Sequence, residues 1–210
     1  MPLLFLDKLS ETEFLSVWKI EESSDFLLKK NKLTSSEKVV YNSFKNESRK
    51  IQWLSCRILV NEFMKNNGLK GNIYYDEKGK PHLTTGHFIS ISHTPYFAAI
   101  IINKNKAVGI DIEKISERIL KVKNRMASDN ELKITGDNLE HLTTLWASKE
   151  AIYKICGIND LSFNNDIFVD LSKIKNNNYN ARVSHQTLNK NYFLKREVIE
   201  DHILVYVIDI

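Results

Sequence analysis

The feature that most constrains the fold is a block of three short apolar runs between two long helical patterns. The runs are FISISHT, FAAIII and AVGIDIE, each rich in β-branched or aromatic residues and separated by a few turn residues. Runs of this length and composition are typical of β-strands. A helical apolar stripe precedes them, formed by Ile51, Leu54, Ile58, Leu59 and Phe63, and an amphipathic pattern over 139–156 that ends at Gly157 follows them. The order predicts an α+β fold.

The rest of the chain extends this order of helices followed by strands. We expect further helices opened by the Ser10–Glu13 and Ser128–Glu131 capping-box patterns, and others over about 21–46 and 116–126. We expect further strands over 3–6, at the start of NIYYDEKGKPHL, and near 181–186, 192–198 and 204–208. The Asn-rich stretch 175–180 is expected to be a turn or loop.

The two long helices carry related runs, WLSCR over 53–57 and WASKE over 146–150. Such an internal echo predicts two similar α/β halves related by pseudo-twofold symmetry. We expect an N-terminal half over 1–105 and a C-terminal half over 106–210, with the active site in the cleft between them.

Composition narrows the class of protein. With 42% hydrophobic and 27% charged residues, the 210-residue chain is typical of a globular protein. The net charge of +4 is mixed along the chain and forms no dense basic stripe, so we expect no nucleic-acid partner. Two distant cysteines, no basic leader and no apolar run long enough for a bilayer predict a cytoplasmic protein without a membrane span.

The run AVGIDIE carries the most informative chemistry. Side chains alternate along a strand, so Asp111 and Glu113 project together on the face that also holds Gly109. Adjacent carboxylates repel unless a cation lies between them, and hard oxygen ligands suit Mg²⁺. The alternative is a solvated outer face of an edge strand.

Two further segments hold candidate site residues. In WASKEAIYKICG, Trp146, Glu150 and Lys154 are spaced by four and share a helix face, which would also suit an exposed ion pair. Lys80 lies beside Pro81 in a tight turn, and Ser92 and His93 end a strand, where they would contact phosphate oxygens or serve as ordinary turn and strand residues.

Together, the segments GKP, SISHT, VGIDIE and WASKEAIYK resemble, in this order, the signature of the Sfp-type 4′-phosphopantetheinyl transferases. QWLSCRIL, which contains Arg57, resembles the first-half helix of that family. The likeness extends from about residue 49 to residue 157. The stretch RMASDNE departs from the family pattern, and so do the N-terminal lysines Lys29, Lys30 and Lys32, for which we expect a solvated helix end.

The resemblance implies an activity and roles for the matching residues. The enzyme would be of the holo-[acyl-carrier-protein] synthase type, transferring the phosphopantetheine arm of coenzyme A to a serine of an acyl or peptidyl carrier protein. Mg²⁺ would be held by Asp111, Glu113 and Glu150. Coenzyme A would be bound by Arg57, Lys80, Pro81, Ser92, His93, Lys149 and Lys154. Lys154 would also stabilise the leaving phosphate, and the serine proton would pass to Glu150 or, as second choice, Glu131, which helix capping already explains.

Three other function classes remain open. A non-catalytic coenzyme A-binding or regulatory protein would keep the same fold, although retention of the acidic and basic positions favours an enzyme. A nucleic-acid-binding module is disfavoured by the even charge mixing. Another Mg²⁺-dependent phosphotransferase would lack the usual phosphate loop, since GxxxxGK is absent. We expect a monomer because both halves lie in one chain.

Overall fold

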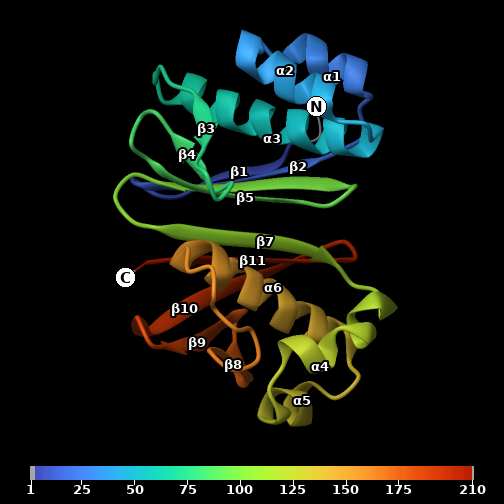
Figure 1. Cartoon of the computed structure of the whole chain (residues 1–210), viewed down its shortest axis with the longest axis vertical. Helices are drawn as coiled ribbons and strands as arrows, with labels where there is room; N and C mark the ends of the chain where they lie inside the picture. The colour runs from blue at the N-terminus through green and yellow to red at the C-terminus, as the bar shows by residue number, and fades with distance from the viewer. Residues whose placement is uncertain (1–2, 210) are drawn as a thin grey trace.

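Two antiparallel β-sheets face each other through a shared apolar core (Figure 1). The structure is a computed structural model that describes residues 3–209. The first sheet has the order β1(Leu3–Ser10), β2(Glu13–Lys19), β6(Phe97–Asn103), β5(Phe88–His93). The second has the order β7(Val108–Lys114), β11(His202–Ile208), β10(Leu188–Ile199), β9(Asn178–His185), β8(Ile167–Lys175).

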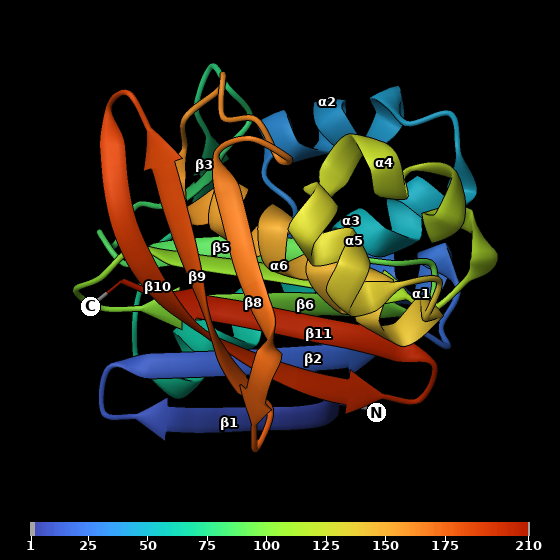
Figure 2. The same cartoon turned by 90° about the horizontal axis from the view of Figure 1, so that it is seen from below.

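Helices cover the outer faces of the two sheets. Helix α3(Glu47–Asn66) packs on the first sheet, and α1(Ser24–Lys30), α2(Ser35–Ser43) and the hairpin β3(Ile73–Tyr75)–β4(Pro81–Leu83) lie around it. Helix α6(Leu139–Cys156) packs on the second sheet. The 3₁₀ helix η1(Glu117–Lys121), α4(Lys123–Met126) and α5(Asp129–Thr135) connect β7 to α6, and α5 lies beside β8 (Figure 2).

Strand β7 is buried on both faces, and its sequence assigns the faces as predicted. Val108, Ile110 and Ile112 enter the core between the sheets. The opposite face meets α6 so closely that a Cβ on Gly109 would lie 2.0 Å from the carbonyl oxygen of Ala151. The glycine of this strand therefore makes room for the backbone of α6.

Two serine side chains join the sheets where β5 runs along the free edge of β7. The backbone N–H of Ile110 donates to Ser90 Oγ at 3.1 Å, and that of Ile112 donates to Ser92 Oγ at 3.2 Å. Residues two apart on a strand share a face, so both hydroxyls of β5 meet β7. The serines thereby satisfy edge N–H groups of β7 that no neighbouring strand pairs.

The second long helix has the predicted bounds. The Asn138 side chain accepts a hydrogen bond from His141 N at its start, and Gly157 ends it in the left-handed region with φ 64°. A glycine at this position adopts positive φ without the steric cost of a Cβ. The capping box of Ser128 and Glu131 is also present and opens α5.

The predicted helix at Ser10–Glu13 is wrong. Residues 13–19 form β2, which pairs with β1 on one side and β6 on the other. Ser10 instead accepts a hydrogen bond from Thr12 N in the hairpin turn. Pairing on both sides and burial of Leu15 and Val17 outweigh the local capping pattern. Strand β8 was not predicted, and the helical pattern over 21–46 divides into α1 and α2.

The mixture of helices and antiparallel sheets confirms the α+β class. The pseudo-twofold relation and the division at 105/106 stay predictions. Within residues 3–209, no helix combines the length and the apolar character needed to cross a bilayer.

Candidate active site in the cleft between helices α3 and α6

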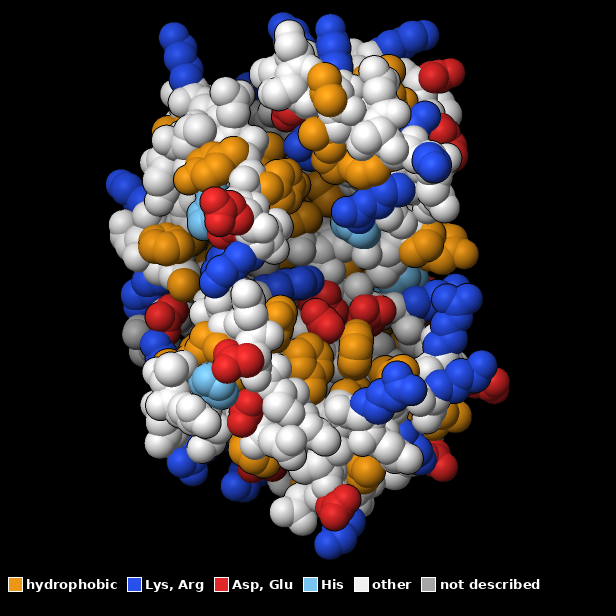
Figure 3. All heavy atoms as spheres, viewed as in Figure 1, with side chains coloured by type: hydrophobic (Ala, Val, Ile, Leu, Met, Phe, Trp, Pro, Cys, Tyr) orange, Lys and Arg blue, Asp and Glu red, His pale blue; other side chains and the backbone are white. Residues whose placement is uncertain are grey.

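A cleft opens on the face of the molecule where the edges of β5 and β7 meet. It consists of two adjoining cavities of ≈ 390 Å³ and ≈ 490 Å³ that share Gly79, Pro81, Ile91 and Lys154. Helix α3 and the β3–β4 hairpin lie on one side of it, and α6 lies on the other. Figure 3 shows acidic and basic side chains gathered across the middle of this face.

Asp111 is the most firmly held acidic group of the first cavity. Its Oδ1 accepts hydrogen bonds from Ser92 Oγ and from Lys154 Nζ, both at 2.7 Å. Its Oδ2 is buried and has no hydrogen-bond partner among residues 3–209. A buried oxygen without a partner is costly, so this one is suited to a ligand that the protein alone does not supply.

Glu113 and Glu150 complete a group of three carboxylates around the cavity. Burial, with the negative charge of Asp111, raises the pKa of Glu113 to about 7, although Trp146 Nε1 donates to Glu113 Oε1 at 3.0 Å. Burial and the Asp111 charge also raise the pKa of Glu150. The shared repulsion identifies a place where positive charge would be stabilised.

Helix α3 contributes a stripe of cations and one aromatic ring at a spacing of four. The guanidinium carbon of Arg57 lies 3.2 Å from the ring centroid of Trp53, and Arg57 Nε donates to Glu37 at 3.0 Å. Arg57 Nη1 is buried and has no partner among residues 3–209. Since the side chain lines the first cavity, this N–H group is available to an anion there.

His93 is held as a neutral acceptor next to these cations. Arg49 Nη1 lies 2.5 Å from His93 Nε2. Burial, together with the positive charges of Arg49 and Lys154, lowers the pKa of His93 to about 4. At neutral pH the imidazole therefore accepts from Arg49, so it can act as an imidazolium toward phosphate only if a bound anion raises its pKa again.

The carboxylates fit Mg²⁺ by donor chemistry and by the free Oδ2 of Asp111. Among residues 3–209, no group of three or more acidic, His or Cys side chains is gathered closely enough to enclose an ion by itself. Mg²⁺ usually keeps several waters and combines one or two carboxylates with substrate phosphates. An open set of three acidic groups beside free cationic donors fits that mode of binding.

A comparison with protein-family models matched residues 107–207, just under half of the chain, to the 4′-phosphopantetheinyl transferase superfamily. Residues 107–207 are thus similar to this superfamily. The match contains β7 and α6 and hence all three carboxylates and Lys154. A comparison with curated proteins gave no match.

The match over residues 107–207 confirms, for the superfamily, the resemblance inferred from the motifs, whereas the Sfp-type subfamily stays a prediction. The superfamily transfers phosphopantetheine, with coenzyme A as donor and carrier proteins as acceptors. The first cavity holds most of the site residues predicted from the sequence: Arg57, Pro81, Ser92, His93, Asp111, Glu113, Glu150 and Lys154.

Lys80 lines the second cavity instead. Its ammonium nitrogen lies 3.3 Å from where a Cβ on Gly157 would stand, at the C-terminal end of α6. This end of a helix carries partial negative charge, which favours a cation. Lys80 therefore brings a cation from the β3–β4 hairpin close to the end of the helix that carries Glu150.

The structure does not bring two of the predicted site residues of the transferase region into the cleft. Glu131 and Lys149 form a buried ion pair of 2.7 Å on the opposite side of α6, within the C-terminal core. Lys149 and Glu150 are neighbours in sequence, but about 100° separates them around a helix, so only one of them faces the cleft. Ser92 does line the cleft, but it donates its single proton to Asp111 rather than to an open site.

Sequence reasoning missed Arg49, Cys56 and Tyr75, which also line the first cavity, and treated Trp53 only as a sign of duplication. The signal for Arg49 was present, because Arg49, Trp53 and Arg57 lie at positions i, i+4 and i+8 of one helix. The same spacing on α6 had already identified Trp146, Glu150 and Lys154.

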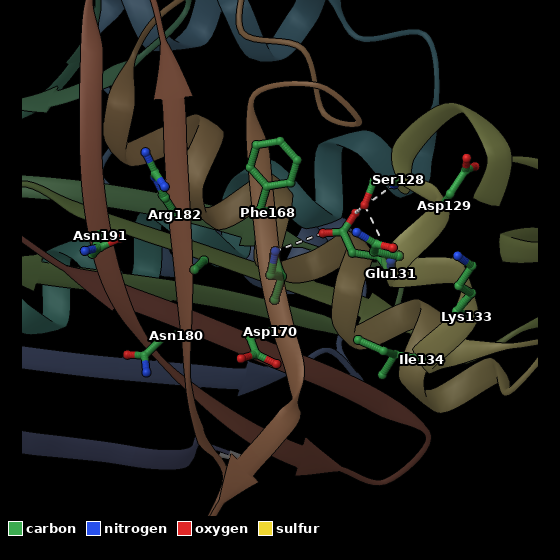
Figure 4. A pocket seen from close by; sticks show the side chains of 13 residues that line it. Ser128, Asp129, Glu131, Lys133, Ile134, Phe168, Asp170, Asn180, Arg182 and Asn191 are labelled. Carbon is green, nitrogen blue, oxygen red and sulfur yellow. Dashed lines mark hydrogen bonds between the residues drawn. The ribbon is translucent and has the colours of Figure 1, made fainter.

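A further cavity, with a volume of ≈ 650 Å³, lies between α5 and the outer face of β8, β9 and β10 (Figure 4). Its wall combines the exposed apolar side chains of Ile134 and Phe168 with Arg182 and several asparagines. Glu131, its one buried carboxylate, is fully hydrogen-bonded. The buried carboxylate of this cavity therefore has no oxygen left for a ligand, in contrast to Asp111 Oδ2 of the cleft.

Proposed function

We propose that this protein transfers the 4′-phosphopantetheine group of coenzyme A to a serine of an apo acyl or peptidyl carrier protein, with Mg²⁺ and with release of 3′,5′-ADP. The superfamily match supports the reaction class. The observation that carries the finer proposal is the buried Oδ2 of Asp111, which has no hydrogen-bond partner among residues 3–209, in a cleft that combines three carboxylates with Arg57 and Lys154.

In the proposed reaction the serine oxygen of the carrier protein attacks the β-phosphorus of coenzyme A. One P–O bond forms to the serine, and the bond from the β-phosphorus to the bridging oxygen breaks. The α-phosphate then leaves as part of 3′,5′-ADP. Such transfers depend on positioning and on stabilisation of negative charge more than on covalent help from the enzyme.

Asp111, Glu113 and Glu150 would hold the metal ion, which when bound would neutralise charge on the pyrophosphate. The remaining groups would bind the phosphates directly. Arg57 offers its free Nη1, and Lys154 extends from α6 with its side chain partly exposed to the cleft. Lys80 and Pro81 would bound the coenzyme at the second cavity.

Glu150 is the carboxylate to which we assign the serine proton. It lines the cavity, and no side-chain or backbone donor within residues 3–209 hydrogen-bonds to it. A carboxylate whose oxygens are not engaged by other protein groups can accept a proton as the serine oxygen attacks, as a general base must. Glu131 is not retained for this role, because its two oxygens are already occupied away from the cleft.

Intact-mass spectrometry of an apo acyl carrier protein, incubated with the protein, coenzyme A and Mg²⁺, tests the proposal. We expect a gain of one phosphopantetheine group that disappears with EDTA and in Asp111→Asn, a variant that keeps the shape of the side chain. Asp170→Asn is the matched control, because Asp170 lies on the outer face of β8 and should leave activity unchanged.

Two results would contradict the proposal in different ways. Coenzyme A binding without transfer to any of several acyl and peptidyl carrier proteins would favour a non-catalytic binding protein. Neither binding nor transfer would refute the assignment of the cleft. Because both sides of the cleft come from one chain, we also propose that a monomer is active, and light scattering that finds an obligate oligomer would contradict this.

A further inference from the structure

We propose that the buried pair Lys149–Glu131 is a positioning device that sets the rotation of α6, and thereby places Glu150 and Lys154 in the cleft, without touching substrate. This inference rests on the proposed function of the cleft. It replaces the direct catalytic and coenzyme-binding roles that the sequence suggested for these two residues.

Lys149 is anchored at three points. Its side chain is 0% exposed, and its Nζ donates to Glu131 Oε2, to the carbonyl oxygen of Phe163 and to that of Ile167, each at 2.7 Å. An ammonium group has three protons, so all of its donors are used. The three acceptors belong to α5, to the loop after α6 and to β8. The lysine therefore ties α6 to three separate segments.

Both carboxylate oxygens of Glu131 are also engaged in hydrogen bonds. Its Oε2 accepts from Ser128 N at 2.8 Å, from Ser128 Oγ at 2.9 Å and from Lys149, and its Oε1 accepts from Val169 N at 2.8 Å. Figure 4 shows Glu131 between Ser128 and strand β8. The Val169 contact satisfies an N–H group at the outer edge of the sheet, where β8 has no further strand beside it.

Because Lys149 and Glu150 belong to the same helix, the contacts of Lys149 also determine where the Glu150 carboxylate lies in the cleft. A side-chain carboxylate about 6 Å from the axis of a helix moves by about 1 Å for each 10° of rotation about that axis. A misplacement of about 1 Å can lower a reaction rate by about 100-fold. Glu150 follows Lys149 directly in the chain, so any rotation that the lysine resists is one that would displace Glu150.

The choice of a charged pair in a core also favours this role. Replacing a buried ion pair by apolar side chains of similar volume is often neutral or stabilising, so such pairs are weak contributors to stability. The pair instead fixes the rotation of α6, because three oxygen atoms define a single position for the ammonium group of Lys149. Apolar contacts around α6, such as those of Leu145 and Ile152, specify a position less sharply.

Steady-state kinetics of Lys149→Met and Glu131→Gln test the inference. We expect kcat to fall by about 10- to 100-fold while the KM for coenzyme A changes by less than about threefold, since the lost contact is not with substrate. The double variant should be no worse than the more impaired single variant, because the two side chains act as one unit. Lys173→Met is the matched control, since Lys173 is an exposed lysine of β8, and it should behave as the wild type.

Two further measurements keep the test decisive. If Lys149→Met does not fold, Glu131→Asp keeps the charge but shortens its reach by one methylene, and it should show the same split between kcat and KM. Direct titration with coenzyme A and Mg²⁺, which requires no transfer, should give an affinity within about threefold of the wild type in both single variants, since the lost contact is not with coenzyme A.

Several outcomes would overturn the inference. Full activity in Lys149→Met and Glu131→Gln would show that no positioning is needed. A large rise in KM or a loss of coenzyme A affinity at unchanged kcat would show that Lys149 contacts the coenzyme. A wild-type chain that neither transfers nor binds would refute the proposed function and this inference together, whereas an active wild type with active variants would refute the inference alone.

Discussion

Replacing Gly109 by alanine should push α6 away from β7 and thereby disrupt the cleft. Gly109 lies on β7, two residues before Asp111, on the face that meets α6. An added Cβ would stand 2.0 Å from the carbonyl oxygen of Ala151 and 3.1 Å from a methyl of Val207. The first contact is with helix backbone, which cannot rotate away as a side-chain end would.

The size of the effect follows from that distance. A carbon and a carbonyl oxygen in close contact lie about 3.3 Å apart, so α6 would have to move away from β7 by more than about 1 Å. Overpacking of this kind typically costs about 1–3 kcal/mol. For a chain of this size, each kcal/mol lowers Tm by about 2–4 °C. The same movement separates Glu150 from Asp111 and should lower the transfer rate by about 100-fold.

Thermal unfolding and the mass-spectrometric transfer assay, run on Gly109→Ala, measure both effects. Gly71→Ala is the matched control, because its Cβ would meet the side chains of Thr85, at 2.6 Å, and Thr84, at 3.0 Å, rather than backbone. We expect the control to lose less stability than Gly109→Ala and no activity. Wild-type Tm and wild-type rate in Gly109→Ala would refute the close packing of β7 on α6.

Three further outcomes are expected. Ser92→Ala should lower the free energy of unfolding by about 1–3 kcal/mol in urea titrations, since Ile112 N–H loses its acceptor. It should also impair transfer, because Asp111 loses the hydrogen bond from Ser92. Ser90→Ala, the control, should cost similar stability but keep activity. The pKa of His93 is lowered to about 4 from 6.5, so its contribution to stability is complete above pH 6.5 and is lost as pH falls toward 4. At pH 5 the wild type should therefore lose up to about 2 kcal/mol relative to His93→Gln, less where solvent screens the group, and equal losses would contradict this. Calorimetric titration should find weak Mg²⁺ binding to the protein alone and tighter binding with coenzyme A, and equal affinities would argue against a metal shared with substrate phosphates.

The parts of the fold that the sequence predicted are those encoded locally. Helix α6 has its expected bounds because Gly157 adopts the left-handed conformation that ends it. The division of β7 into a core face and a face carrying Asp111 and Glu113 follows from the alternation of a strand. Strand β8 was missed although Ile167, Val169 and Leu171 alternate inward, so its signal was readable.

The errors arose where tertiary contacts decided the outcome. The Ser10–Glu13 pattern suits a helix start, but the following residues complete a sheet between β1 and β6, which no local rule reveals. Likewise, the sequence indicates that Lys149 and Glu150 face different directions, but not that one direction leads into a closed core. The burial of Lys149 depends on the carbonyl oxygens of Phe163 and Ile167, which lie 14 and 18 residues further along the chain.

The cleft depends on both halves of the chain through the same contacts that hold the sheets together. The core between the sheets takes Leu15 and Ile101 from the first half and Ile110 and Leu204 from the second, so either half alone would expose an apolar sheet face. The serines of β5 satisfy N–H groups of β7, and Ser92 also holds Asp111. The serine that joins the two sheets at the cleft is therefore also the residue that orients the acidic group. Rigid joining of the sheets and preorganisation of the carboxylate are thus one property of the fold.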